Sequence, residues 1–381
     1  MATSYKHGIT TIEDNSGSRP TTPFSTSVIG LVATAPNADA TALPLNEPVL
    51  FTNIYEAMTV AGSDGTLLNN LTEIHGQVRP RIVIVRVAQG ATVDETKANT
   101  LAGIQALEVS SSRIGITPRI LIAGFLDEHV EVANALASAA QKLNGFAYAS
   151  AVGDSVTEAI NYRQSFAQRE LELLWPNHMG IDAKTGISIE KPAVAIAAGM
   201  RALIDEKHGW HHSISNMPVN GVAALSHDVS WSLTDPATDA AVLNENQITT
   251  FASRGGYRLW GLRTCSSDNL FAFETTVRSG QIIREIIADA LEWAVDKPMS
   301  VQLVRDIIAT INAEIRSRVA LGHLVGGRAW YDEEANSPTT LKGGKLIIHY
   351  DYTPVPPLED LTLIQKITDQ YLTEYAVILS N

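Results

Sequence analysis

Short apolar runs rich in β-branched residues recur along the first half of the chain, separated by segments with a helical period. The runs lie in SVIGLVATAP, RIVIVRVA, RILIAGF, FAYASAV and LELLWP. One intervening segment, residues 128–143, repeats its apolar positions at helical spacing: Val132, Leu136, Ala139, Ala140 and Leu143. Strands that alternate with helices predict an α/β domain, in which helices cover the faces of a parallel-type sheet.

Longer helical patterns follow. KPAVAIAAGMRALIDEKHGW predicts an Ala-rich helix that begins at a proline and ends near Gly209. Residues 275–295 and 301–319 predict two long amphipathic helices. The apolar stripe of the second helix is expected to be Val301, Val304, Ile308, Ile311, Ile315 and Val319. Its opposite face carries Gln302, Asp306 and Arg316, which suit water or a polar partner.

The last third of the chain predicts a β-hairpin built from LVGGRAWYDEEAN and GGKLIIHYDYTPVPP. Apolar and polar residues alternate along the second segment, as they do in a strand. The glycine pairs of both segments are expected to supply positive φ at hairpin turns. LEDLTLIQKITDQYL predicts a further extended or helical run. With its two helices, this part of the chain predicts an α+β C-terminal domain.

Both ends of the chain carry β-prone segments beside linkers. At the N-terminus the candidates for strand pairing are Ile9, Thr10, Thr11 and Ile12, and the polar tether NSGSRPTTPFSTS follows them. At the C-terminus the candidates are Tyr375, Ala376, Val377, Ile378 and Leu379. Such strands pair with exposed sheet edges, so two of them beside a hairpin favour strand exchange between copies of the chain.

Composition is that of a globular protein, and 381 residues favour two domains. The net charge of −13 at pH 7 opposes nucleic acid or an anionic membrane as a partner of the whole surface. We see no secretory signal pattern and no apolar run that could span a bilayer, and therefore expect a cytoplasmic product. Cys265 is the single cysteine, which excludes an internal disulfide framework and predicts a small buried hydrophobe.

Candidate chemistry is sparse. His208, His211 and His212 in EKHGWHH invite a zinc site, but Gly209 interrupts the helical spacing that zinc pairs use, which favours a solvated loop. Ser226, His227 and Asp228 are consecutive, and adjacent side chains point to different faces, so they do not predict a nucleophilic relay. The sequence therefore predicts no catalytic residue, metal or cofactor.

The stretch RGGYRLWGLRTCSSD, residues 254–268, has no acid, base or nucleophile at a catalytic spacing. Its glycines predict a sharp turn or a close backbone approach. If the segment is extended, Tyr257, Leu259 and Leu262 lie on the face opposite Arg258, Trp260 and Arg263. The tryptophan is then a packing anchor, and the arginines either are solvated or donate to groups across a domain or subunit seam. The location of the stretch between two domains predicts a hinge region.

Several segments together resemble one family, the contractile tail sheath proteins of myophages and of R-type pyocin-like particles. The most distinctive is LNENQITTFASRGGYRLWGLRT, which fills the pattern G-x-R-x-W-G-x-R-T. The residues that fill it are Gly256, Arg258, Trp260, Gly261, Arg263 and Thr264. The N-terminal stretch YKHGITTIEDNSGSRPTTPFSTS, the middle stretch beginning KPAVAIAAGM and the hairpin with P-x-x-P-x-E-x-L also resemble that family, in the same order.

This resemblance implies a structural subunit rather than an enzyme. Sheath subunits form six-subunit rings, stacked helically around a tail tube, and the arms add strands to sheets of neighbouring subunits. The implied partners are other copies, the tube protein, and baseplate and tail terminator proteins, with no cofactor, nucleic acid or membrane insertion. Contraction drives the tube through a bacterial envelope, and the particle is assembled in the host cytoplasm and released on lysis.

The resemblance also implies a layout. Residues 1–24 form an N-terminal arm and linker, 25–253 an outer α/β domain, 254–368 an inner tube-facing domain, and 369–381 a C-terminal arm. Gln302, Asp306 and Arg316 are the candidate tube contact. Two alternatives remain open, an α/β enzyme such as a hydrolase and a non-contractile scaffold that exchanges arms.

Overall fold

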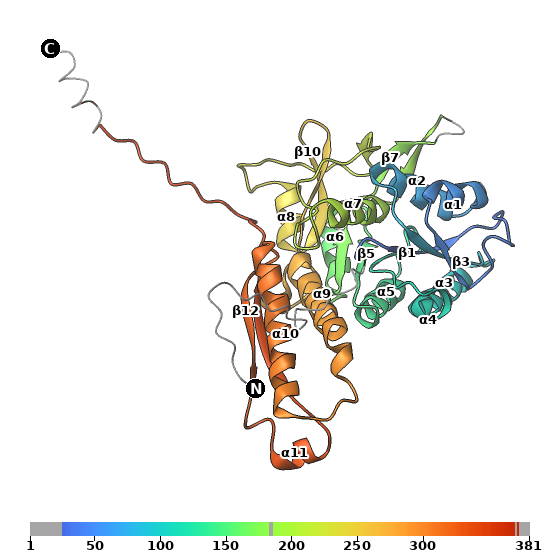
Figure 1. The fold of residues 1–381 in the computed structure, drawn as a ribbon. Helices are drawn as coiled ribbons and strands as arrows, with labels where there is room; N and C mark the ends of the chain where they lie inside the picture. The colour runs from blue at the N-terminus through green and yellow to red at the C-terminus, as the bar shows by residue number, and fades with distance from the viewer. Residues whose placement is uncertain (1–24, 183–185, 370–371, 373–381) are drawn as a thin grey trace, which may run out of the picture.

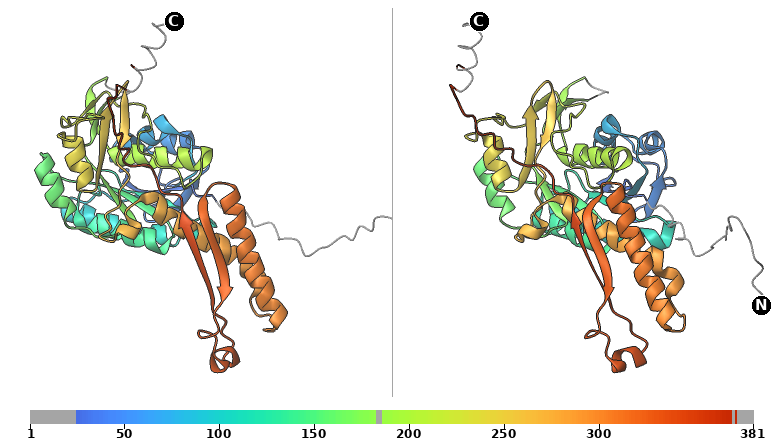
Figure 2. Two further views of the ribbon diagram at one scale, coloured as in Figure 1. Left: turned by 90° about the vertical axis from the view of Figure 1, so that its left-hand side faces the viewer. Right: turned by 60° about the vertical axis from the view of Figure 1, so that its left-hand side comes forward.

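The computed structural model describes residues 25–182, 186–369 and 372. An α/β body carries an elongated domain of helices and a β-ribbon that projects from one side (Figures 1 and 2). The predicted arm strands, 9–12 and 375–379, lie outside the described residues. None of the helices in the described part of the chain combines the length and apolarity needed to cross a membrane.

The body is built on an eight-stranded sheet with the order β11-β10-β6-β5-β4-β1-β3-β2. Its strands are β1 (Ile29–Thr34), β2 (Pro48–Phe51), β3 (Ile82–Val87), β4 (Ile120–Ile122), β5 (Phe146–Ser150), β6 (Leu171–Leu174), β10 (Ile248–Ser253) and β11 (Tyr257–Trp260). The inner strands pair in parallel, whereas the edge strands β2 and β11 are antiparallel to their neighbours. The predicted α/β class is therefore confirmed.

Helices cover both faces of this sheet because its strands alternate apolar side chains between two cores. In β1, Ile29 and Leu31 enter one core and Val32 enters the other. The first core is covered by α1 (Ile54–Val60), α2 (Leu67–Gln77) and α7 (Ala193–Lys207). The second is covered by α3 (Val93–Glu108), α4 (Ser110–Ile114), α5 (Val130–Lys142), α6 (Val156–Arg163) and α8 (Asp239–Glu245).

The Ala-rich helix α7 begins after Pro192 and ends before Gly209, as predicted. Its small residues let it lie close to α2, where a Cβ on Gly199 would be 3.1 Å from the carbonyl oxygen of Ile74. A three-stranded sheet, which the pattern did not predict, flanks the body. It consists of β7 (His178–Ile181), β8 (Ser188–Lys191) and β9 (Ala224–Leu225).

The projecting domain has its own core between two long helices and a two-stranded antiparallel ribbon. Its elements are α9 (Glu274–Leu291), α10 (Val301–Ala320), β12 (Leu324–Tyr331), α11 (Pro338–Lys342) and β13 (Ile348–Pro354), with short 3-10 turns at Asn269–Phe271 and Glu292–Ala294. The core comprises Ile283, Ile287, Ile307, Ile311, Ile315, Leu324 and Ala329. Both predicted helices and the predicted hairpin are present, and α11 lies at the tip of the ribbon (Figure 1).

Two details of the prediction for this domain are wrong. The buried stripe of α10 is Ile307, Ile311 and Ile315, because these residues face the core shared with α9 and the ribbon, while Val301 is 71% exposed. Positive φ occurs at Gly344 but at neither glycine of VGGRAW. Gly327 instead allows close approach, because a Cβ there would be 3.0 Å from the Cα of Tyr352 on β13.

Candidate assembly site

The stretch RGGYRLWGLRT supplies the turn and the second strand of the hairpin β10–β11, at the edge of the large sheet. Gly255 (φ 63°) and Gly256 (φ 106°) make its turn, and Ser253 pairs with Tyr257. Gly261 (φ 142°) follows β11, where a Cβ would lie 2.7 Å from the Cα of Thr249. The glycines of this stretch therefore serve backbone geometry. The expected boundary between residues 253 and 254 falls at the turn of this hairpin.

Side chains alternate along β11. Leu259 is fully buried, whereas Trp260 packs edge-on against Trp231 with ring centroids 5.2 Å apart. Arg258 Nη1 donates to the carbonyl of Asn216 at 2.8 Å. Two residues after Gly261, Arg263 donates to both carboxylate oxygens of Glu359, with Nε–Oε1 2.6 Å and Nη2–Oε2 2.5 Å. Its partner belongs to the segment that leads to the C-terminus, 96 residues away.

A buried cluster of charges joins the projecting domain to the body. This interdomain ion cluster consists of Arg201 and Asp205 on α7 and Glu274 and Arg278 on α9. Their side chains are at most 3% exposed. Arg201 Nη2 lies 2.7 Å from Asp205 Oδ1 and its Nη1 lies 3.5 Å from Glu274 Oε2, while Arg278 also pairs with Asp205. Tyr148 on β5 donates its hydroxyl to Glu274 at 2.6 Å.

Ion pairing within the cluster offsets the cost of removing its charges from water. Burial alone lowers the pKa of the Arg201 guanidinium, but Asp205 and Glu274 outweigh burial and hold that pKa above its ordinary value. Nearby Glu172 on β6 lacks such a cation at contact distance. Burial and the charge of Glu274 therefore raise the pKa of Glu172 well above its usual range, and Thr249 donates to its carboxyl at 2.5 Å.

Further contacts extend this attachment along α9. Gln281 donates to the carbonyl of Gly145 at 2.8 Å, and Arg119 on the body pairs with Glu285. Val277 of α9 lies in the first core of the body, whereas Ile283 and Ile287 lie in the core of the projecting domain. A helix that is shared by two cores and held by buried ions resists bending, which argues against the predicted hinge at this seam.

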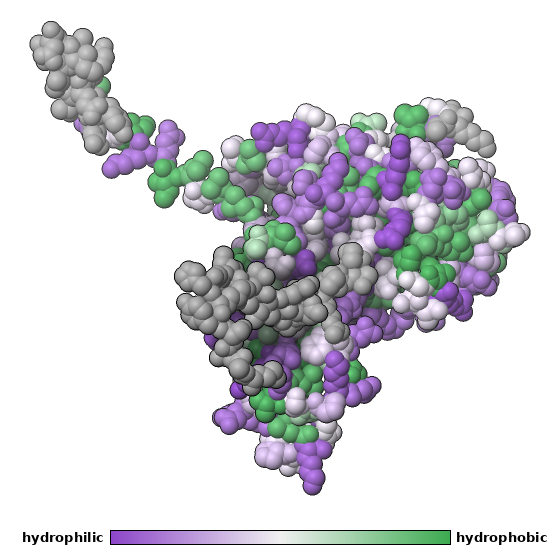
Figure 3. Space-filling view, in the orientation of Figure 1, coloured by the Kyte–Doolittle hydropathy of each residue, from purple (hydrophilic) through white to green (hydrophobic). Residues whose placement is uncertain are grey.

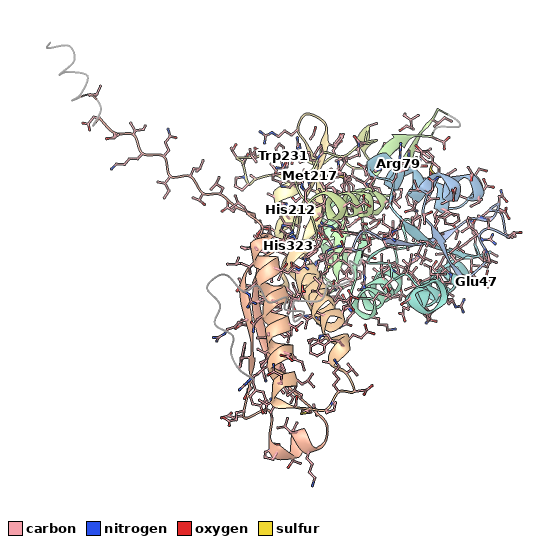
Figure 4. All side chains as sticks on the ribbon, in the orientation of Figure 1. Glu47, Arg79, His212, Met217, Trp231 and His323 are labelled. Carbon is pink, nitrogen blue, oxygen red and sulfur yellow. The ribbon has the colours of Figure 1, made fainter. Side chains whose placement is uncertain are left out.

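The histidines after α7 lie at the same seam. The ring of His211 is 4.5 Å from that of His323, which follows α10, and 4.4 Å from that of His212. Figure 4 shows His212 and His323 close together at this seam. The prediction of a solvated loop is therefore wrong for His211, which is partly buried against Trp210 and His323. Sequence spacing gave no signal for His323. In the described part of the chain, no group of three or more histidine, cysteine or acidic residues could hold a metal ion.

Two smaller expectations can be compared with the structure. Ser226 Oγ and His227 Nδ1 are 3.2 Å apart, so these two adjacent side chains meet although they were expected to point to different faces, and the prediction that the three residues form no relay is not contradicted. The imidazole of His227 also lies against the indole of Trp175, with ring centroids 5.3 Å apart. Cys265 is fully buried in the second core of the body, as predicted, and burial raises the pKa of its thiol to about 12.

Neither outer edge of the two-stranded ribbon is paired with another described strand. The backbone of Ala329 on β12 exchanges hydrogen bonds with the side chain of Asn312 on α10, at 2.9 and 3.1 Å. The outward-facing backbone groups of β12 are thus occupied at this position. Among the described residues β13 pairs only with β12, so its other edge is open to an added strand.

Beyond β13, residues 355–359 lie beside the body, and the segment 360–369 extends away from it (Figures 1 and 2). Four of its large apolar side chains are 65–92% exposed: Leu361, Leu363, Ile364 and Ile367. Figure 3 shows both apolar and polar residues along it. On α10, the candidate tube-contact residues Gln302, Asp306 and Arg316 are all exposed, and Gln302 donates to Asp306 at 2.6 Å.

Comparison with known proteins accounts for nearly the whole chain. Residues 68–265 match the model of the phage tail sheath protein central domain, and residues 266–368 match that of the phage tail sheath C-terminal domain. The chain is 45% identical to the tail sheath protein of Escherichia phage P2 and 38% identical to the major tail sheath protein of Serratia phage KSP20, covering 97% of both chains in each case. Its fold resembles the sheath of an extracellular contractile injection system, the PVC sheath complex in the contracted state, at 17% identity and a TM-score of 0.73 over 97% of this chain and 99% of that one.

Proposed function

This chain belongs to the phage tail sheath family, and from that premise we propose how its copies assemble and move. It is a structural subunit of the contractile sheath of a phage tail or phage-tail-like particle, not an enzyme. Its copies form stacked six-subunit rings, wound helically around a tail tube and linked through their terminal arms. Contraction of this sheath drives the tube through a bacterial envelope.

The observation that carries the proposal is the open edge of β13. The ribbon is already stabilised by packing on helices, but the unpaired backbone groups along its open edge can still bind an added strand through main-chain hydrogen bonds. Because Asn312 occupies the outer edge of β12 at Ala329, β13 is the edge that receives an arm. The arm strands are Ile9–Ile12 and Tyr375–Leu379 of neighbouring copies, whose β-branched and aromatic residues suit a sheet edge.

The roles of the two domains and of the arms follow from the difference in their stiffness. We place the outer α/β domain at residues 25–265 and the inner domain at 266–368, because β11 belongs to the large sheet and Cys265 to its core. Arms at 1–24 and 369–381 complete the layout. The interdomain ion cluster makes the two domains move as one body, while the arms absorb the change in packing between copies.

The inner domain faces the tube through the polar side of α10. Exposed polar pairs contribute about 0–1 kcal/mol each, so a face of Gln302, Asp306 and Arg316 binds strongly enough to template assembly and weakly enough to release. Charge reversal at Asp306 and Arg316 is expected to reduce assembly of the sheath on tubes. If both variants assemble on tubes like the unchanged protein, this contact lies elsewhere.

Baseplate proteins lie at one end of the helical sheath, and tail terminator proteins lie at the other. Structures of similar fold include the anti-feeding prophage baseplate and its helical sheath in the contracted state, which supports helical assembly and a baseplate partner. These similarities, at 19% identity, concern the fold.

Deletion of residues 375–381 tests the arm proposal. We expect a folded monomer that fails to form ordered cylinders in electron micrographs. Replacing the same residues by a Gly/Ser tract of equal length is the matched control for arm length, and it is expected to fail in the same way because it lacks β-prone side chains. Normal cylinders from the truncated chain would contradict arm exchange.

A further inference from the structure

Two sequence motifs that lie far apart in the chain meet at a single ion pair. Arg263 closes the G-x-R-x-W-G-x-R-T motif, and Glu359 is the acidic residue of P-x-x-P-x-E-x-L. Their side chains form a bidentate pair with distances of 2.6 and 2.5 Å. We propose that Arg263 and Glu359 form a clamp that sets the direction in which the C-terminal arm leaves the subunit.

The position of the clamp supports this role. Residues 355–359 line a cleft of about 460 Å³ together with Trp260–Arg263 and the loop at His211–Asn216. The backbone therefore passes beside the body as far as Glu359, although the side chain of Leu358 already points to solvent and is 77% exposed. Beyond it, Leu361, Leu363 and Ile364 are 65%, 81% and 92% exposed, so the segment has left the surface. Glu359 stands where the chain changes from docked to free.

The geometry of the pair suits a directional restraint. The planar fork of a guanidinium fixes both the position and the orientation of a carboxylate, which a lysine does not. Arg263 is itself oriented, because its guanidinium lies over the ring of Phe273 at 5.3 Å. Gly261 and β11 hold the backbone from which Arg263 projects.

The clamp acts on assembly rather than on folding. The side chains of Arg263 and Glu359 are 33% and 35% exposed, and exposed pairs contribute little to the stability of a monomer. Fixing the origin and direction of a tether raises the effective concentration of its end at a neighbouring subunit. The same contact recurs in every subunit, so a small change in its free energy affects the addition of each subunit to the helical sheath. This inference rests on the proposed arm exchange.

Charge reversal tests the clamp. Arg263→Glu and Glu359→Arg are each expected to raise the critical concentration for cylinder formation about fivefold or more, the upper range for an exposed pair, because like charges then repel. The double variant, with the charges exchanged, is expected to return that concentration to within about twofold of the unchanged chain. Thermal unfolding midpoints of the monomers stay the same. Lys142→Glu on α5, which breaks a surface pair with Glu108 on α3, is the matched control.

The outcomes separate the two proposals. Single variants that assemble like the unchanged chain, or an exchanged pair that does not restore assembly, overturn the clamp. If a charge-reversed chain fails to fold, Glu359→Gln replaces it, with the same expectation of weaker assembly by a stable monomer. Deletion of residues 375–381 distinguishes the alternatives. If that deletion abolishes cylinders while the single variants assemble normally, arm exchange holds and only the clamp fails.

Discussion

Replacement of Arg278 by methionine is the sharpest test of the stiff seam between the two domains. Arg278 and Arg201 together face the carboxylates of Asp205 and Glu274 in a site that is at most 3% exposed. Removing one partner of a buried ionic cluster costs about 3–5 kcal/mol, because it leaves excess charge without water. Nε and Nη1 of Arg278 have no hydrogen-bond partner, so part of its own desolvation is recovered on removal. We therefore expect a loss near 3 kcal/mol.

Urea denaturation of the full chain measures this loss, followed by far-ultraviolet circular dichroism and tryptophan fluorescence. The unchanged chain is expected to unfold in one transition, because α9 belongs to the cores of both domains. Arg278→Met is expected to split that transition, with the projecting domain unfolding first. Arg284→Met is the matched control on the same helix, since Arg284 is exposed, and its expected effect is within about 0.5 kcal/mol.

The reasoning is refuted by a loss below about 1 kcal/mol for Arg278→Met, or by equal losses for the two variants. Either result would mean that the cluster does not couple the domains. A split transition in the unchanged chain would likewise show that the seam is weaker than its burial indicates.

Three further predictions concern stability measured by the same denaturation. Gly261→Ala places a Cβ 2.7 Å from the Cα of Thr249 at φ 142° and is expected to lose about 2–5 kcal/mol, whereas Gly326→Ala, with no atom within 4 Å, changes stability by less than about 0.5 kcal/mol. Burial raises the pKa of the Asp127 carboxyl from 3.8 to about 7. Its contribution to the free energy of unfolding is therefore full below about pH 4 and is lost as pH rises through 7. Asp127→Asn is expected to remove up to about 4 kcal/mol of that pH dependence. Burial lowers the pKa of His211 from 6.5 to about 4 and also lowers the pKa of His323. The free energy of unfolding that depends on these neutral imidazoles is therefore full above pH 6.5 and is lost as pH falls toward 4. His323→Gln is expected to reduce this loss. Because the Asp127 and histidine trends oppose each other, each is measured as the free energy of unfolding of the variant minus that of the unchanged chain, across pH. A difference that does not change with pH refutes the prediction for that variant.

The large sheet was predictable because its inner strands are continuous apolar runs, buried on both faces. Ile29–Thr34 and Ile82–Val87 are buried at every position, which makes their pattern unmistakable. The edge strand Pro48–Phe51 is short and only half buried, so it carried no such signal. In α10 the pattern gave the helix but not its orientation, because Ile307 and Ile308 are adjacent and only packing against the ribbon selects Ile307.

The candidate site was harder to predict because its contacts join distant residues. Asp205 and Arg278 are 73 residues apart, and each reads as an ordinary charge on the polar side of its own helix. Their burial depends on how α9 lies against α7, and the hydrophobic pattern of neither helix specifies that arrangement. His323 was missed for the same reason. Arg263 was singled out by its motif, but its partner Glu359 emerged only from the docking of the segment after β13.

The arrangement of stiff and soft parts places the source of contraction between subunits. A body whose domains share α9 and a buried ion cluster stores little energy in bending, since deforming it would strip buried charges of their partners. The free-energy difference between extended and contracted sheaths must then come from exchanging one set of side-chain contacts between copies for another. The strand exchange that we propose along β13 does not depend on those contacts, because added strands bind through the backbone. If Arg263 and Glu359 fix where each arm starts, the links between copies persist while the bodies rotate, and the sheath changes shape without coming apart.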